Sequence, residues 1–155
     1  SISELRNTKI IFTKANADTD GRVINTMIDD YVAKHDNTIA FTSMGQLNYL
    51  SALQFMDAVV GNSSSGLIEA PSFKIGTIDI GDRQKGRIKT DSVISCLPKK
   101  SNIDSAFNKM YSKEFQNILD KVENAYGKGG ASKAIVNIIK GVNLHNIIKK
   151  PFHDF

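Results

Sequence analysis

The feature that most constrains the fold is the alternation of short apolar runs with segments of helical periodicity. Apolar runs typical of strands lie at 8–13, 38–42, 58–60, 77–80 and 92–97. Apolar residues recur at helical spacing over 23–32, 47–56 and 67–73 between these runs. Alternating strands and helices are typical of a parallel sheet, and continuous apolar strands favour burial on both faces. The sequence therefore predicts an α/β fold with a Rossmann-like, doubly wound parallel sheet.

The last third of the chain is predicted to be helical. Helical stripes lie over 103–110 and 115–122, with Ser112 as the cap between them. Glycines at 127–130 break the pattern, and Ser132 is expected to cap a last helix. We expect one domain over 1–141, followed by a tail over 142–155 that packs on the body or on a missing domain.

The composition excludes several classes of protein. Cys96 is the only cysteine, so no internal disulfide can form, and we expect a reducing, cytoplasmic location. One cysteine and three scattered histidines also exclude a Cys/His zinc cluster. The net charge of +4 and the absence of tryptophan do not favour nucleic-acid binding. No apolar run approaches the length of a membrane span. We therefore expect that the protein binds no metal, cofactor or nucleic acid and does not insert into a membrane.

The serine loop, Gly-Asn-Ser-Ser-Ser-Gly at 61–66, follows an apolar strand and opens a short helix. Its glycines admit a ligand close to the backbone, and its hydroxyls and N–H groups suit an anion. Leu67 and Ile68 stand where a Walker A loop needs Lys and Ser/Thr, so a P-loop is excluded. The pattern fits a diphosphate cradle or a simple helix-capping turn. Glu69, one turn beyond, could hold ribose hydroxyls or could be an exposed helix residue.

A second loop, the basic loop Gly-Asp-Arg-Gln-Lys-Gly-Arg at 81–87, follows the next apolar strand. Its cations suit a phosphate or carboxylate, although a solvated turn would have the same composition. Two further turns follow strands: 16–21, which begins with Asn16, and 43–45, which contains Met44. Ligands of α/β folds bind at the carboxyl ends of strands, so all four loops are candidates for one site.

Together, these loops resemble one family. The stretches at 14–22, 43–50, 61–73 and 81–87 are similar to the C-terminal domain of UDP-N-acetylglucosamine 2-epimerases, and more closely to the hydrolysing branch that feeds sialic-acid and legionaminic-acid synthesis. The resemblance runs to about Gly141. It implies one half of a glycosyltransferase-B-type fold, with the UDP-sugar held between two Rossmann-like halves.

The resemblance also implies site residues, which would bind UDP and a UDP-N-acetylhexosamine. Ser63 and Ser64 would bind the diphosphate beside Gly66, and Glu69 would hold the ribose. Arg83 would contribute to the UDP site, Met44 would meet the uracil through its backbone, and Asn16 would lie by the ligand.

The family's catalytic acids and histidine find no counterpart in this sequence, so the chain alone is expected to fold but to be inactive. The expected partners are the missing N-terminal domain and, in a homo-oligomer, further copies. The residues alone leave two alternatives open: the donor-binding half of a glycosyltransferase of the same architecture, and a non-enzymatic receiver-like α/β module. The carboxyl end of the strand at 58–60 lacks the phosphorylatable Asp that a receiver needs.

Overall fold

The computed structural model describes residues 1–5, 7–16 and 19–145, with Thr19 and Asp20 described by their backbone alone. The chain forms two compact units, Ser1–Ala125 and Tyr126–Phe155. The elements of the first unit are η1 (Ile2–Glu4), β1 (Ile10–Thr13), α1 (Thr19–Val32), β2 (Thr38–Phe41), α2 (Gly45–Leu53), β3 (Ala58–Gly61), α3 (Ser65–Ile68), η2 (Ala70–Phe73), β4 (Gly76–Ile80), β5 (Val93–Cys96), α4 (Lys100–Met110) and α5 (Lys113–Leu119). The second unit holds α6 (Ala131–Gly141).

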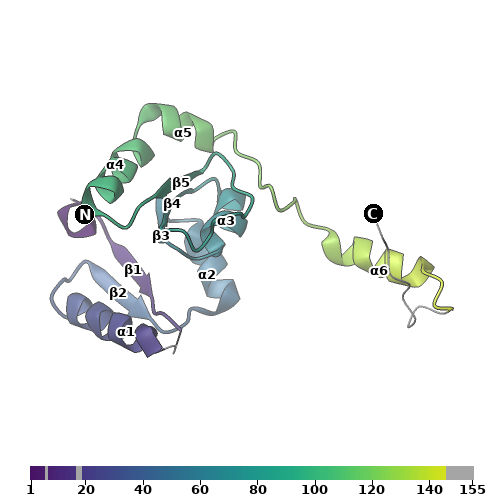
Figure 1. Ribbon diagram of the computed structural model, residues 1–155, viewed down its shortest axis with the longest axis horizontal. Helices are drawn as coiled ribbons and strands as arrows, with labels where there is room; N and C mark the ends of the chain where they lie inside the picture. The colour runs from purple at the N-terminus through teal and green to yellow at the C-terminus, as the bar shows by residue number, and fades with distance from the viewer. Residues whose placement is uncertain (6, 17–18, 146–155) are drawn as a thin grey trace. The chain divides into compact units, whose positions relative to one another are not determined.

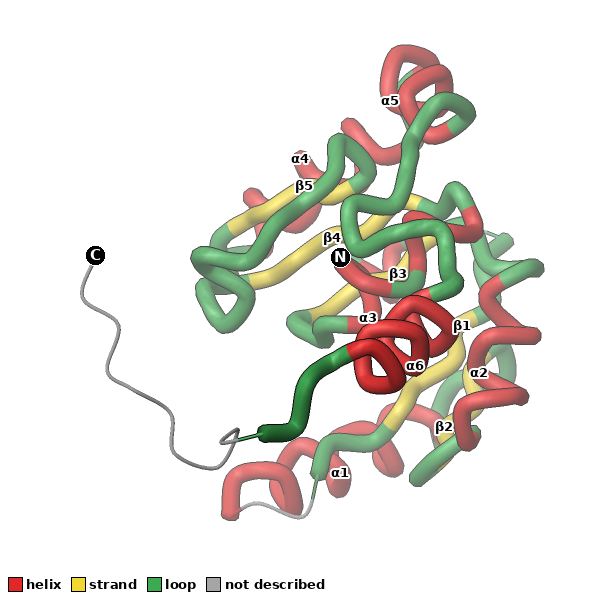
Figure 2. The backbone as a smooth tube through the Cα atoms, turned by 90° about the vertical axis from the view of Figure 1, so that its right-hand side faces the viewer, coloured by secondary structure: helices red, strands yellow, loops and turns green. Residues whose placement is uncertain are grey.

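All described strand pairs are parallel, as predicted, but the strands form two sheets (Figures 1 and 2). One sheet pairs β1 with β2, with Ile11 opposite Ile39. The other has the order β3–β4–β5, with Ile78 opposite Val60 on one side and Ile94 on the other. The predicted α/β, Rossmann-like class is confirmed, and the break between β1 and β3 is a feature that the sequence did not predict.

The three-stranded sheet is covered on both faces. On one face Ile78 and Ile94 pack with Phe107 and Met110 of α4, and the same cluster continues to α5. Gly76 allows this approach, because a Cβ there would lie 2.2 Å from the Met110 sulfur. On the other face, residues of α2, η2 and β3 surround a second cluster, formed by Leu53, Ala70 and Ile75. Successive strand side chains alternate between faces, which is why β3 contributes to both clusters.

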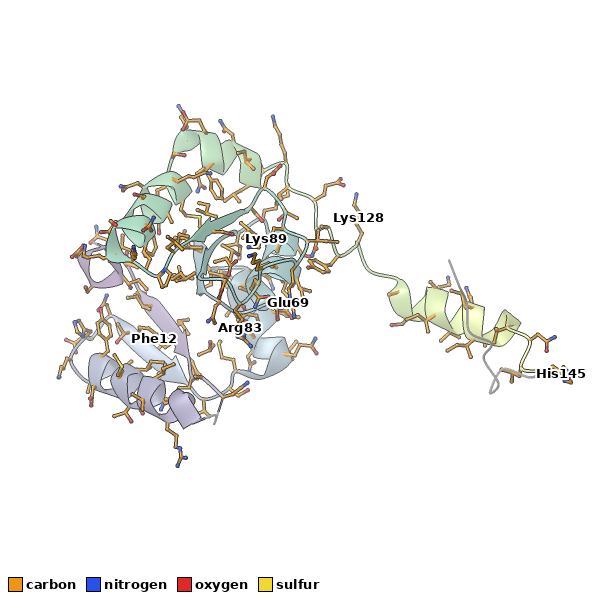
Figure 3. The ribbon with its side chains drawn as sticks, viewed as in Figure 1. Phe12, Glu69, Arg83, Lys89, Lys128 and His145 are labelled. Carbon is orange, nitrogen blue, oxygen red and sulfur yellow. The ribbon has the colours of Figure 1, made fainter. Side chains whose placement is uncertain are left out.

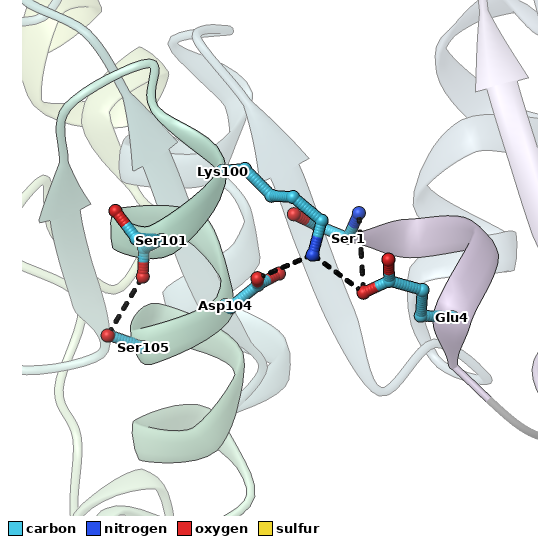
Figure 4. A network of polar contacts seen from close by, with 6 residues as sticks. All are labelled: Ser1, Glu4, Lys100, Ser101, Asp104 and Ser105. Atoms are coloured by element: carbon cyan, nitrogen blue, oxygen red, sulfur yellow. Dashed lines mark hydrogen bonds and ion pairs between the residues drawn. The ribbon is translucent and has the colours of Figure 1, made fainter.

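A surface ion-pair network ties η1 to α4 (Figure 4). The Lys100 ammonium lies 2.8 Å from carboxylate oxygens of both Asp104 and Glu4. The hydrogen bond to Asp104 has the largest effect on the pKa of Lys100, and together with the hydrogen bond to Glu4 it raises that pKa to about 12. The Asp104 carboxyl has a lowered pKa, chiefly through its hydrogen bond with Lys100. The network joins the segment that leads into β1 to the first turns of α4.

The predicted helix caps and the predicted apolar face of α2 are confirmed only in part. The Ser112 cap is confirmed, since its hydroxyl accepts from the Phe115 N–H at 3.2 Å. The Ser132 cap is wrong: α6 begins at Ala131 after Gly130, whose φ of 84° turns the chain into the helix. In α2, Leu47 is 79% exposed, because Tyr49, Leu50 and Leu53 form the face that packs inward.

The described residues contain no helix long and apolar enough to cross a membrane. In the second unit, α6 carries exposed apolar side chains, including Ile135 and Ile139. Residues 146–155 of the predicted tail lie outside the described residues, and the boundary predicted at 141 stays a prediction.

Candidate functional site

A cavity of about 500 Å³ lies where β1, β2 and β3 end. Its polar lining comes from several separate segments: Thr13, Thr42, Ser43, Gln46, Tyr49, Ser63, Ser65 and Glu69. Apolar side chains of Ile11, Val59 and Val60 also line it. Of the residues singled out in the sequence, the cavity brings together Met44, Ser63 and Glu69. Ser64, Gly66, Arg83 and Asn16 are not among its lining residues.

Met44 stands immediately before the first turn of α2. Gly45 follows with a φ of 65°, a conformation that favours glycine, and its N–H donates to the Ser43 hydroxyl at 3.2 Å. Ser43, Met44 and Gly45 of this turn all line the cavity.

The serine loop lies beside the cavity with some of its donors already used. The Ser65 N–H donates to the Ser63 hydroxyl at 3.4 Å, and the Leu67 N–H donates to the Ser64 carbonyl at 3.0 Å. Ser64 precedes α3, which spans only Ser65–Ile68. A single helical turn has a small dipole, so the groups that this loop offers to an anion are its hydroxyls and amides rather than the helix itself.

Gly66 has a packing role. It is buried, and a Cβ on it would lie 2.4 Å from the Thr77 methyl group. The Thr77 hydroxyl donates to the Gly66 carbonyl at 2.8 Å. Gly66 therefore lets the serine loop lie directly on β4.

Tyr49 is a site residue that the sequence analysis missed. Its hydroxyl hydrogen-bonds the Ser65 hydroxyl and so joins α2 to α3 beside Glu69. Burial raises the pKa of Tyr49, and the negative charge of Glu69 adds to the effect, whereas the Ser65 hydrogen bond lowers it. The phenol is therefore neutral and able to donate at neutral pH. The sequence could have indicated this role, because Tyr49 lies on the apolar face of α2 and a buried tyrosine hydroxyl needs a hydrogen-bond partner.

The basic loop is attached to the serine loop through Asn62. The buried Gln84 amide donates to the Asn62 carbonyl at 2.7 Å. The Arg83 guanidinium makes longer contacts, 3.4 Å and 3.5 Å, to the backbone and side-chain oxygens of Asn62. Arg83 is labelled in Figure 3. Arg83 is otherwise exposed, so its cation is held at the mouth of the serine loop and is available to a ligand.

An ion pair with a buried carboxylate anchors the segment that connects the basic loop to β5. Asp79 is 1% exposed, and its carboxylate lies 2.8 Å from the Lys89 ammonium. Lys89 also donates to the Ser95 hydroxyl at 2.7 Å. These contacts commit Lys89 to the sheet, whereas Arg83, Lys85 and Arg87 of the basic loop are exposed.

The turn after β1 is held by α1. Asn25 accepts from the Ala15 N–H at 2.8 Å and donates to the Ala15 carbonyl at 3.1 Å. Gly21 packs so closely on the Asn16 carbonyl that a Cβ would lie 1.9 Å from that oxygen. The Asn16 side chain is exposed, and residues 17 and 18 of this turn lie outside the described residues.

Comparison with known proteins places this chain in one family. A sequence model of the UDP-N-acetylglucosamine 2-epimerase family matches residues 1–140. The chain is 41% identical, over 99% of its length, to a GDP/UDP-N,N'-diacetylbacillosamine 2-epimerase (hydrolyzing) from Campylobacter jejuni, and 36% identical, again over 99%, to a polysialic acid biosynthesis protein from Escherichia coli. It spans only 40% of the length of each of these relatives.

A solved structure shares the fold. The S. aureus MnaA–UDP co-structure matches with a TM-score of 0.71 and 20% identity, over 99% of this chain and 40% of the solved one. The extent of the family match and the identity to the Campylobacter protein are sufficient for an assignment. The chain belongs to the UDP-N-acetylglucosamine 2-epimerase family.

Proposed function

We propose that this chain is the UDP-binding half of a hydrolysing UDP-N-acetylhexosamine 2-epimerase. The observation that carries the proposal is the convergence of Met44, from the turn after β2, with Ser63 and Glu69, from the segment after β3, on one cavity at the carboxyl ends of the strands. The 40% coverage of longer relatives supports a cleft completed by another domain. The name of the Campylobacter relative favours the hydrolysing branch, and the name of the Escherichia coli relative favours a role in polysialic acid biosynthesis.

Each predicted residue has a role in this proposal. The backbone at Met44 contacts the uracil, and Glu69 accepts both ribose hydroxyls. The hydroxyls of Ser63 and Ser64 and the Arg83 guanidinium meet the diphosphate, with Gly66 setting the position of the loop. Asn16 borders the ligand from the turn after β1. Tyr49 holds Ser65 and so fixes the wall between the ribose and diphosphate sites.

The proposed reaction needs both a base and leaving-group stabilisation. A base removes the C2 proton of the sugar, and the electron pair forms a C1–C2 double bond as the C1–O bond to UDP breaks. Water then adds across the double bond, its oxygen to C1 and a proton to C2, to give the free 2-epimer. Hydroxyls and a guanidinium stabilise the charge that develops on UDP. Glu69 is the only carboxylate that lines the described cavity and is assigned to ribose, so the base comes from the rest of the protein.

Product analysis of the full-length protein tests the proposal. It is incubated separately with UDP-N-acetylglucosamine and UDP-N,N'-diacetylbacillosamine in deuterated water. We expect UDP and a free 2-epimerised sugar that carries deuterium at C2. A nucleotide-linked epimer would place the protein in the non-hydrolysing branch. Transfer of sugar only when an acceptor is present would contradict the proposal in favour of a glycosyltransferase.

A further inference from the structure

Glu69 lies at a break in the helical segment that follows the serine loop. α3 ends at Ile68 and η2 begins at Ala70, and Glu69 between them has a φ of −105° and a ψ of −48°. Pro71 favours this break, because it has no N–H to donate within a continuing α-helix. The Ser72 N–H donates to the Glu69 carbonyl at 3.0 Å, in the tighter pattern of a 3₁₀ turn. The Ile68 carbonyl is therefore left to a partner from outside the helix.

Asn124 supplies that partner from the connection that follows α5. Its side-chain nitrogen donates to the Ile68 carbonyl at 2.7 Å and to the Ser72 hydroxyl at 2.6 Å. A carbonyl oxygen can only accept, so it is the NH₂ group of Asn124 that faces this junction, with one proton for each acceptor. The two acceptors come before and after Glu69 in the chain, so a single amide holds the backbone on both sides of Glu69.

The connection that carries Asn124 is itself well anchored. It begins at Asp120, whose carbonyl accepts from the Lys74 ammonium, just after η2, at 2.5 Å. In the preceding helix α5, Phe115 and Leu119 are 2% and 5% exposed and belong to the core. Asn124 is therefore presented to the α3–η2 junction from a segment fixed on the core, which is the kind of support that a precise binding group needs.

The direction of the Glu69 carboxylate depends on this backbone. Glu69 is half-buried and lines the cavity, and within the described part of the chain no residue donates a hydrogen bond to its carboxylate. Two ribose hydroxyls are both held only when the two carboxylate oxygens face them, because hydrogen bonds weaken steeply when they are misaligned. A small rotation of the backbone at Glu69 would therefore lose at least one of the two bonds.

We infer that Asn124 is a positioning residue for Glu69: by bonding Ile68 and Ser72, it fixes the turn between α3 and η2 and so aims the Glu69 carboxylate at the ribose. The inference rests on the proposed function, in which Glu69 accepts the ribose hydroxyls. Asn124 is not among the residues that line the cavity, so it acts through Glu69. Its loss impairs recognition of the ribose and leaves the contacts to the base and the diphosphate in place.

Two ligands separate this role from a purely structural one. The full-length protein is titrated calorimetrically with UDP and with 2′,3′-dideoxy-UDP, which keeps the base and the diphosphate but lacks both ribose hydroxyls. The wild type should bind UDP about 10-fold or more tightly, as hydrogen bonds to a charged group predict. In Asn124→Ala this preference should fall about 3-fold or more, while the affinity for 2′,3′-dideoxy-UDP changes by less than about twofold. An unaltered preference would overturn the inference.

A control and a second variant complete the test. Lys74→Met removes the other bond that ties this connection to the segment after η2, and it should keep the wild-type preference for UDP. Asn124→Asp keeps the size of the side chain but sets an oxygen against the Ile68 carbonyl, so it should also lower the preference, and it decides the matter if Asn124→Ala does not fold. Its added charge acts on both ligands alike. An equal fall in Lys74→Met would indicate a general loss of order and would overturn the inference.

A double variant tests whether Asn124 acts through Glu69. In a Glu69→Ala background, adding Asn124→Ala should change the UDP dissociation constant by less than about twofold, because the carboxylate that Asn124 positions is gone. Losses that multiply would overturn the inference. The wild-type preference separates the inference from the proposed function. Equal binding of the two ligands by the wild type would refute the ribose assignment and the inference together, whereas a wild-type preference that Asn124→Ala retains would refute the inference alone.

Discussion

The buried Gln84 side chain donates to the Asn62 backbone carbonyl at 2.7 Å, and this bond joins the basic loop to the serine loop. The two loops follow adjacent strands, β3 and β4, which places Arg83 against Asn62 of the serine loop. The bond thus sets the spacing between the cation and the hydroxyls that would share one diphosphate.

Gln84→Met removes this donor and keeps most of the side-chain volume. We expect the full-length protein to lose about 1 kcal/mol of stability, the usual net value of a hydrogen bond, and to bind UDP more weakly. Calorimetric titration and thermal melting measure the two effects. Gln54→Met, at an exposed glutamine, is the matched control and should change neither. Unchanged UDP affinity in Gln84→Met would show that the two loops bind independently.

Glu69→Gln tests the ribose assignment. The substitution keeps the shape of the side chain but removes the charge, so UDP binding to the full-length protein should weaken by about 1–3 kcal/mol. The melting temperature should change little, because Glu69 is only half-buried. Calorimetry with UDP provides the measurement. An unaltered dissociation constant would return Glu69 to the role of an ordinary helix-terminal residue.

The serine loop is tested with two ligands. Ser63→Ala combined with Ser64→Ala should weaken UDP more than uridine, since only UDP carries the diphosphate. The Ser63 hydroxyl also accepts from the Ser65 N–H, so some loss of loop order is expected for both ligands. The ratio of the two losses is therefore the informative quantity. Equal losses would mean that the serines shape the loop and do not contact phosphate.

Gly66→Ala tests the packing of this loop on β4. The new methyl would overlap the Thr77 methyl at 2.4 Å, so we expect a loss of about 1–3 kcal/mol in the free energy of unfolding. Adding Thr77→Ser removes the clashing methyl and keeps the hydroxyl bound to the Gly66 carbonyl, and should restore part of the loss. Gly141→Ala, where a Cβ meets open space, serves as the control in denaturant unfolding. If the double variant is no more stable than Gly66→Ala alone, the loss of stability does not come from the clash with the Thr77 methyl.

The sequence predicted the elements well where local chemistry decides them. Each apolar run ends at a polar or glycine-rich turn, and the strands at 58–61 and 76–80 lie within a residue of their predicted positions. The α/β fold class followed from the alternation of strands and helices along the sequence. The split into two sheets could not be predicted, since strand pairing depends on contacts between distant segments.

The site was predictable to the extent that its residues lie in loops with a distinctive composition. Met44, Ser63 and Glu69 come from such loops and line one cavity. Tyr49 and Gln84 were missed because each lies in a segment with another evident role, an apolar helix face and a basic turn. Their importance appears only when the partner atoms, on Ser65 and Asn62, are placed beside them.

The last prediction concerns the 155-residue chain by itself, which should catalyse nothing. No histidine lines the described cavity, and its single carboxylate, that of Glu69, is assigned to ribose. The chain should show a cooperative melt by circular dichroism, at a lower temperature than the full-length protein, because the edges of β1 and β3 are unpaired. Weak UDP binding should survive, since the loops that bind the nucleotide are present. It should be weaker than in the full-length protein, because water screens charged contacts that the other half of the cleft would enclose.

A folded sample given UDP-N-acetylglucosamine should therefore release no UDP and no N-acetylmannosamine above the uncatalysed background. Turnover that persists through repurification would show instead that the base lies in this chain.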